Sequence, residues 1–317
     1  MDNNDYELLI TEYEKLNTER PDMYPLSFNE YTHRLNNSFT ESNYLSAPKE
    51  KQIRVALLWM KDGCPLMKYY NAFKERNMAF LNNVLFETAH IMQISNIYST
   101  GTDHGFYGMN ITPNLLAANM MDRIKLVLPE ENGLGNSSFS GTHIANLLMA
   151  VIYKDFEFKE QALELSEKEL NKKAPEYVKC WIRCMRAIVL KKCDVFNEQL
   201  VAFCKAYMKC KGFGINGFNR RFCVEAHGLY NLAVWAYDRE LKEQIMIPQV
   251  PNFCQELAFF QEQNNYSAGE IVHIYPETMD ICNKIMRCEP PKMFLKREGK
   301  KRAIDVDRFV QDVVIGI

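Results

Sequence analysis

Residues 212–217 have the glycine spacing Gly-x-Gly-x-x-Gly of loops that hold a dinucleotide. Such a loop binds pyrophosphate only when it follows a strand, because the strand end and the next helix together direct backbone N–H groups at the phosphates. Here the glycines follow residues 195–211, whose apolar positions have a helical pattern. We therefore predict a turn between two helices, in which Gly212 ends the first helix.

Arg221 and His227 have the separation found in a class of helical ribonucleases, in which both side chains act at one scissile phosphate. Six positions along a helix correspond to about 600°, which places the two side chains about 120° apart. His227 lies in an apolar segment, where a lone histidine is usually a buried, hydrogen-bonded group, and Asn231 is one turn away. A ribonuclease using Arg221 and His227 remains the less favoured alternative.

The remaining reactive residue types predict no cofactor, no metal site and no enzyme activity. Cys180 and Cys184 share a helix face, but no second pair of ligands accompanies them. The ten cysteines mostly lie in apolar helical patterns, which are typical of buried thiols in a reducing compartment. Ser138 lacks the preceding strand that a nucleophile elbow needs.

The overall charge is nearly balanced, with 38 basic and 40 acidic residues in 317. This balance gives no long-range attraction to nucleic acid or to anionic lipid. No stretch reaches the roughly 20 apolar residues that span a bilayer, and residues 1–16 lack the pattern of a secretory signal. We expect a cytoplasmic protein that binds neither nucleic acid nor membrane.

Helix signals dominate the chain, and no convincing run of alternating strand residues is present. Ser27 and Glu30 predict a capping box, and Pro65 stands where a first helical residue is expected. The motif at residues 158–161 recurs at residues 196–199, each copy after an apolar helix end and with Asp155 or Asp194 at a predicted cap. We predict an all-α fold, an irregular array of helix–turn–helix hairpins.

Composition suggests a division of the chain near residues 129–141, which are rich in Gly, Ser, Asn and Glu. We predict an N-terminal helical subdomain at residues 1–128, a hairpin-repeat core at 138–290 and a basic C-terminal tail at 291–317. Within the tail, residues 292–302 read as a solvated turn, residues 304–314 as a helix and residues 313–317 as an extended end.

Residues 222–237 are apolar almost all round, so we predict a helix that is buried centrally and includes Trp235.

The order of features over residues 142–253 resembles the polymorphic-toxin immunity family numbered forty-nine. The matching stretches are the helix at residues 144–155, the motif at 196–200 with its helix to Tyr207, the segment 224–233 and the proline-containing exit at 247–251. The resemblance implies a helical protein that binds and sterically inactivates a cognate bacterial toxin. A helical-repeat adaptor for other proteins is the alternative, and a long concave groove would favour it.

The predicted partner surface combines a glycine-rich loop with an acidic one. Residues 101–108 contain too many glycines for a helix and carry polar and aromatic side chains with no evident helix to bury them, namely Asp103, His104, Phe106 and Tyr107. Glu130 and Glu131 add charge complementarity toward a basic toxin. The alternative is that Phe106 and Tyr107 fold back and fill a gap between helices.

Overall fold

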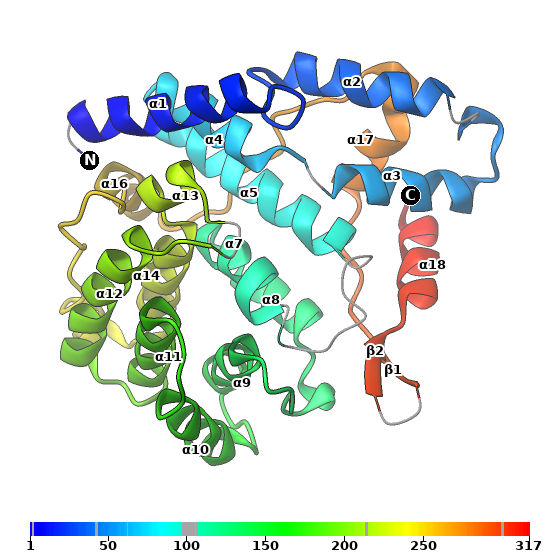
Figure 1. Cartoon of the computed structure of the whole chain (residues 1–317). Helices are drawn as coiled ribbons and strands as arrows, with labels where there is room; N and C mark the ends of the chain where they lie inside the picture. Colours follow the sequence, from blue (N-terminus) through cyan, green and yellow to red (C-terminus); the bar gives the residue numbers. More distant parts are fainter. Residues whose placement is uncertain are drawn as a thin grey trace.

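The computed structural model describes residues 1, 3–41, 44–61, 63–96, 105, 107–212, 215–298 and 301–317. Over these residues the chain is a helical array with one small hairpin of strands (Figure 1), which confirms the predicted all-α class. The boundaries proposed at residues 128, 138 and 290 remain a prediction. The buried apolar core runs as one cluster from Tyr6 to Val313.

The first helices form a layer at one end of the molecule, where α1 and α2 lie above α4 and α5 (Figure 1). The predicted cap is present in a variant form: Ser27 Oγ accepts from Glu30 N (3.2 Å), and the Glu30 carboxylate accepts from Leu26 N (2.8 Å), one residue before the cap. Pro65 begins α4 as predicted. The elements are α1 (Asn3–Glu19), α2 (Phe28–Glu41), η1 (Tyr44–Ser46), α3 (Lys49–Met60), α4 (Pro65–Lys74) and α5 (Met78–Ser95).

After α5, the chain forms short helices and turns in the centre of the molecule. They are the π-helical turn η3 (Tyr107–Ile111), α7 (Thr112–Ala117), α8 (Met121–Val127) and the 3₁₀ turn η4 (Glu130–Asn132). The expectation that residues 101–108 are too rich in glycine for a helix is wrong for Tyr107 and Gly108, which belong to η3. The glycines serve close approach instead: a Cβ on Gly108 would lie 2.2 Å from the carbonyl oxygen of Gly141.

Two helical hairpins follow, as the repeated motif predicts, with α9 (Ser140–Ile152) against α10 (Lys159–Leu170) and α11 (Glu176–Val189) against α12 (Cys193–Met208). The first helices of the two hairpins, α9 and α11, also pack together. The predicted caps are wrong, because Asp155 precedes the start of α10 by several residues and Asp194 lies inside the first turn of α12.

The segment after α12 contains α13 (Gly217–Arg221), α14 (Val224–Ala236), α15 (Arg239–Lys242) and α16 (Gln255–Gln263). A turn joins two helices here, as predicted, but Gly212 does not end the first of them, because α12 ends at Met208 with Lys209 as its C-cap. Gly212 has a φ of 114°, and residues 213 and 214 lie outside the described residues. Helix α14 packs on α7 and is buried through Val234, which confirms its central position. Trp235 is nevertheless 47% exposed, so its predicted burial is wrong. Val234 and Tyr237 are only 6% exposed, so the last turn is uncovered only on the side that carries Trp235.

The C-terminal part returns to the N-terminal layer. It contains η5 (Glu277–Met279), α17 (Asp280–Arg287), an antiparallel hairpin of β1 (Leu295–Glu298) and β2 (Lys301–Ile304), and α18 (Val306–Gly316). Helix α16 packs on α5, and α17 and α18 pack on α3. The segment 292–302, predicted to be a turn, is partly a pair of strands. The prediction of an extended end at 313–317 is wrong, because α18 continues to Gly316.

None of the ten cysteines forms a disulfide, and eight are buried, as their apolar sequence positions predict. Over the residues described, no helix is both long and apolar enough to cross a membrane.

Candidate functional site

The structure describes only part of the two predicted partner segments. Asp103, His104 and Phe106 lie outside the described residues, and of Tyr107 only the backbone is described. Glu130 and Glu131 form η4 and are exposed. Their role in binding stays a prediction.

An exposed aromatic side chain that the sequence did not single out lies beside Gly105, in the first of these segments. Phe139 immediately precedes α9 and is 47% exposed. A Cβ on Gly105 would lie 2.9 Å from Phe139 Cδ1, so the ring sits directly beside the end of the glycine loop. Its signal in the sequence was weak, because one apolar residue in a Ser- and Gly-rich stretch has no periodicity.

The connection from η4 to Phe139 is tied to the body of the protein. Asn146 of α9 is fully buried and bonds both backbone groups of Gly135, as donor to the carbonyl oxygen (3.0 Å) and as acceptor from the N–H (2.8 Å). Arg302 of β2 donates to the carbonyl oxygen of Leu134 (3.0 Å). Phe139 is thus presented on a fixed frame.

The two predicted acidic residues differ in how free their charges are. Glu131 accepts a hydrogen bond from Lys292, which holds the pKa of the Glu131 carboxyl below its usual value. The acidic loop and the basic run therefore meet. Glu130 lies near Tyr153, at the opposite end of α9 from Phe139, and supplies the more available negative charge.

Ser140, His143 and Glu169 lie together at the start of α9, but their order does not fit hydrolysis. Ser140 Oγ donates to Glu169 Oε1 (2.7 Å), and His143 Nε2 lies 3.4 Å from Glu169 Oε2. A catalytic triad needs the imidazole between hydroxyl and carboxylate. Here the carboxylate is in the middle, and Lys172 also pairs with it (2.7 Å).

The alternative ribonuclease pair is not assembled. His227 is fully buried in α14, where its Nε2 accepts from the backbone N–H of Cys254 (3.1 Å) and its ring stacks on Phe253. Burial lowers the pKa of His227 to about 3. Arg221 ends the separate helix α13, so the two side chains do not share a helix. Asn231 does not bond His227; it bonds carbonyl groups of α7.

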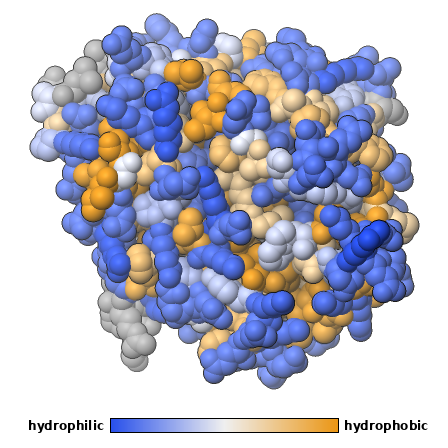
Figure 2. All heavy atoms as spheres, turned by 180° about the vertical axis from the view of Figure 1, so that it is seen from behind, coloured by the Kyte–Doolittle hydropathy of each residue, from blue (hydrophilic) through white to orange (hydrophobic). Residues whose placement is uncertain are grey.

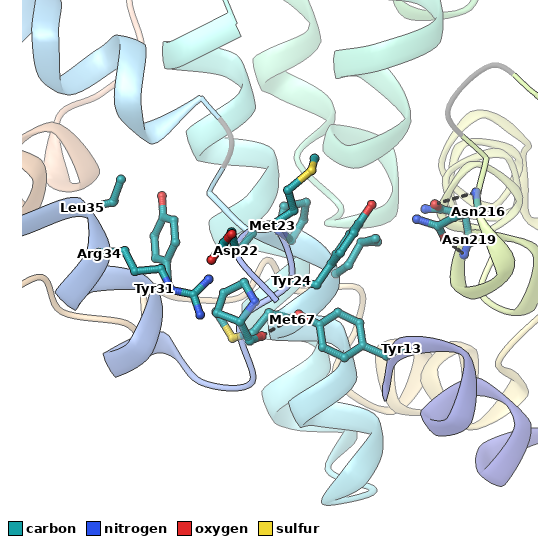
Figure 3. Close-up of a pocket in the computed structure, with 14 residues that line it drawn as sticks. Tyr13, Asp22, Met23, Tyr24, Tyr31, Arg34, Leu35, Met67, Asn216 and Asn219 are labelled. Atoms are coloured by element: carbon teal, nitrogen blue, oxygen red, sulfur yellow. Dashed lines mark hydrogen bonds between the residues drawn. The ribbon is translucent and has the colours of Figure 1, made fainter. Parts of the chain in front are cut away.

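A hollow of about 580 Å³ lies between α1, α2, α4 and α13. Figure 3 shows Tyr31 and Arg34 on one side of it and Asn216 and Asn219 on the other. Its polar groups already have partners within the chain: Tyr13 donates to the carbonyl oxygen of Pro25 (2.6 Å), and Arg34 donates to that of Pro21 (2.6 Å). The two asparagines cap α13 through each other.

The described residues contain no group of three or more His, Cys, Asp or Glu side chains placed to hold a metal ion. In comparisons with known proteins, no family model, no curated protein and no solved structure matches this chain.

Proposed function

We propose that this protein binds a cognate protein toxin and neutralises it sterically, as its resemblance to the immunity family implies. The observation that carries the choice of surface is Phe139, a half-exposed aromatic ring fixed at the start of α9. Aromatic side chains contribute much interface area at low entropic cost, and binding energy concentrates on a few such anchors.

The acidic loop favours a basic partner. Glu130 is exposed at the opposite end of α9 from Phe139, so its charge would attract a basic toxin as a second contact, separate from the ring. The frame made by Asn146 and Arg302 is already ordered, so little conformational entropy is lost on binding. A helical body seated on the toxin would then exclude its substrate.

The test is co-expression with the toxin encoded by the neighbouring gene, with cell survival and complex formation as readouts. Phe139→Ser is expected to weaken the complex by at least about tenfold, as for a hot-spot residue. Glu130→Lys is expected to slow association and to reduce its dependence on salt. Both variants should keep the parent's melting temperature within a few degrees, roughly the effect of a surface change.

Phe259→Ser is the matched control, because Phe259 is 49% exposed and lies on α16, away from this surface. If Phe139→Ser protects and binds like the parent, Phe139 is not the anchor and the proposed surface is wrong. If no product of the neighbouring gene is toxic or bound, the toxin-neutralising function itself is rejected. Replacing Phe106 and Tyr107 with Ser in the same assay tests the predicted loop.

The second candidate function, a helical-repeat adaptor, is favoured only by the two consecutive hairpins α9–α10 and α11–α12. The face in Figure 2 has apolar patches separated by hydrophilic side chains, which suits a compact contact surface better than one long groove. Binding of several unrelated proteins by the purified chain would support the adaptor.

A further inference from the structure

A second hollow, of about 520 Å³, lies where the end of α14 meets the α7–α8 turn, α15 and the residues after α16. We call it the α14 hollow. Aromatic, amide and basic side chains make up most of its wall, and none of the described residues that line it is Asp or Glu. These lining residues are Trp235, Tyr237, Tyr266, Asn119, Asn231, Asn265, Arg239 and Lys242, with Met121 and Val234.

The wall of the α14 hollow contains two buried amide atoms without a hydrogen-bond partner. Asn231 is 1% exposed, and its Nδ2 donates to the carbonyl oxygens of Leu116 (3.2 Å) and Ala117 (3.1 Å). These bonds fix the amide orientation, so the atom left over is the acceptor Oδ1. Asn119 Nδ2, a donor, is also unsatisfied. Buried polar groups are nearly always paired, so this donor and this acceptor can each take one further hydrogen bond.

The backbone that presents these groups is held in an uncommon conformation. Asn119, Asn265 and Tyr266 have φ values of 58°, 52° and 54°, in the left-handed region that side chains other than glycine rarely occupy. All three residues line the α14 hollow. Asn119 follows α7, and Asn265 and Tyr266 follow α16, where left-handed residues close a helix C-terminus with backbone hydrogen bonds. These caps fix the backbone on two sides of the hollow.

The open side of the α14 hollow combines an exposed ring with positive charge. Trp235 is 47% exposed, although the preceding turns of its helix are buried. Lys242 Nζ lies 5.2 Å from the centroid of the Tyr266 ring. Arg239 is three positions before Lys242 on α15, which brings both charges to one side of that helix. Arg239 Nε also pairs with Glu243 (3.2 Å) in solvent, so a phosphate would compete with that carboxylate.

We propose that the α14 hollow binds a nucleoside monophosphate. A nucleobase would stack on Trp235 and place an edge with adjacent donor and acceptor against Asn231 Oδ1 and Asn119 Nδ2. Its phosphate would lie toward Arg239 and Lys242. An acidic side chain would pair with the cations but would bring no donor for Asn231. A glutamine side chain would match the amides but would leave the indole and the cations unused.

The direct test is calorimetric titration of the purified protein with AMP, GMP, CMP and UMP. We expect saturable binding of at least one of them with a Kd below about 1 mM, a modest affinity for a ligand of this size. Trp235→Ala should weaken binding by at least about tenfold, which is within the range of base stacking on an aromatic side chain. Phe259→Ala, at a similarly exposed ring outside the hollow, should leave binding unchanged.

Two further variants separate base from phosphate recognition. Asn119→Gly removes the amide and relaxes the left-handed backbone, so the fold is kept while both nucleotide and nucleoside should bind more weakly. The double variant Arg239→Gln, Lys242→Gln should weaken only the nucleotide. Absence of saturable binding for all four nucleotides, or unchanged binding in Trp235→Ala or in the double variant, would overturn the proposal.

Discussion

Lys68, Glu87 and His273 form a charged group inside the N-terminal half of the core. The Lys68 and Glu87 side chains are both fully buried and lie 3.2 Å apart, and His273 Nδ1 is 2.7 Å from the other Glu87 oxygen. Burial alone would raise the pKa of Glu87, but Lys68 and His273 outweigh it and hold that pKa below its usual value. The carboxylate is therefore charged in the folded state and depends on its two partners.

Removing one partner of this group is expected to be costly. Lys68→Met should lower the free energy of unfolding by about 3–5 kcal/mol, because it leaves a buried charge poorly compensated. Denaturant unfolding measures this loss. Lys168→Met breaks a pair whose side chains are both 65% exposed and should change stability by less than about 1 kcal/mol. Equal effects in the two variants would contradict the importance of burial.

The buried histidines predict how stability depends on pH. Burial lowers the pKa of His227 to about 3 and that of His90 to about 4, from an ordinary value of 6.5. The unfolded chain then binds more protons than the folded protein between these values, so stability is full above pH 6.5 and is lost as the pH falls toward 3. His227→Gln keeps an acceptor for Cys254 N–H and should flatten this profile; an unchanged slope would refute the assignment.

Helix α9 is the element that positions the proposed toxin surface. Because Asn146 holds both backbone groups of Gly135, Asn146→Leu leaves a buried N–H and a buried carbonyl unpaired. We expect a loss of about 2–4 kcal/mol, roughly two unsatisfied groups. Asn146→Asp keeps the acceptor but places a buried carboxylate against the Gly135 carbonyl oxygen, so at neutral pH it should lose at least as much in unfolding experiments. Part of that loss should be recovered as the pH falls and the carboxyl is protonated; no recovery would show that the tether is not the cause.

Sequence motifs predicted helices and hairpins well where residues close in the sequence also contact one another in the structure. Ser27 and Glu30 start α2 as their spacing indicates, and the apolar ends at residues 149–152 and 187–190 close real hairpins. The β1–β2 pair was missed, because its four-residue strands are rich in basic residues and too short for a clear alternation. The exposure of Trp235 was not predicted, because composition shows that a helix is apolar but not which of its side chains neighbouring elements cover.

Binding sites were harder to predict than elements. The α14 hollow joins Asn119, Asn231 and Tyr266, which come from three distant parts of the chain and meet only through tertiary packing. No spacing rule connects such residues. The acidic loop at 130–131 could be recognised from composition, but its pairing with Lys292 could not.

At the scale of the whole molecule, the two ends of the chain belong to one structure. Helix α18 packs on α3, and its residues Phe309, Val310 and Val313 are buried. Because α16 and α17 also pack on the N-terminal layer, we expect the chain to unfold in a single cooperative transition.

This interlocking gives a direct test. Phe309→Ala should destabilise the whole protein by about 3–5 kcal/mol, as for other buried aromatic residues. Ile315→Ala on the same helix, at a side chain 82% exposed, should change stability by less than about 0.5 kcal/mol. Hydrogen exchange should show that Phe309→Ala also reduces the protection of α3. Loss of protection confined to α18 would mean that the C-terminal helix unfolds independently.

The exposure of Trp235 gives the molecule a convenient optical property. The other two tryptophans are less exposed: Trp59 is partly buried and lies edge-on to Phe39 at 4.4 Å, and Trp181 is 4% exposed in α11. Dissolved acrylamide should therefore quench the emission of Trp235 far more than that of the other two. The difference between the emission spectra of the parent and Trp235→Phe isolates the emission of Trp235 at the end of α14. The wavelength of its emission maximum reports how strongly water hydrates this surface.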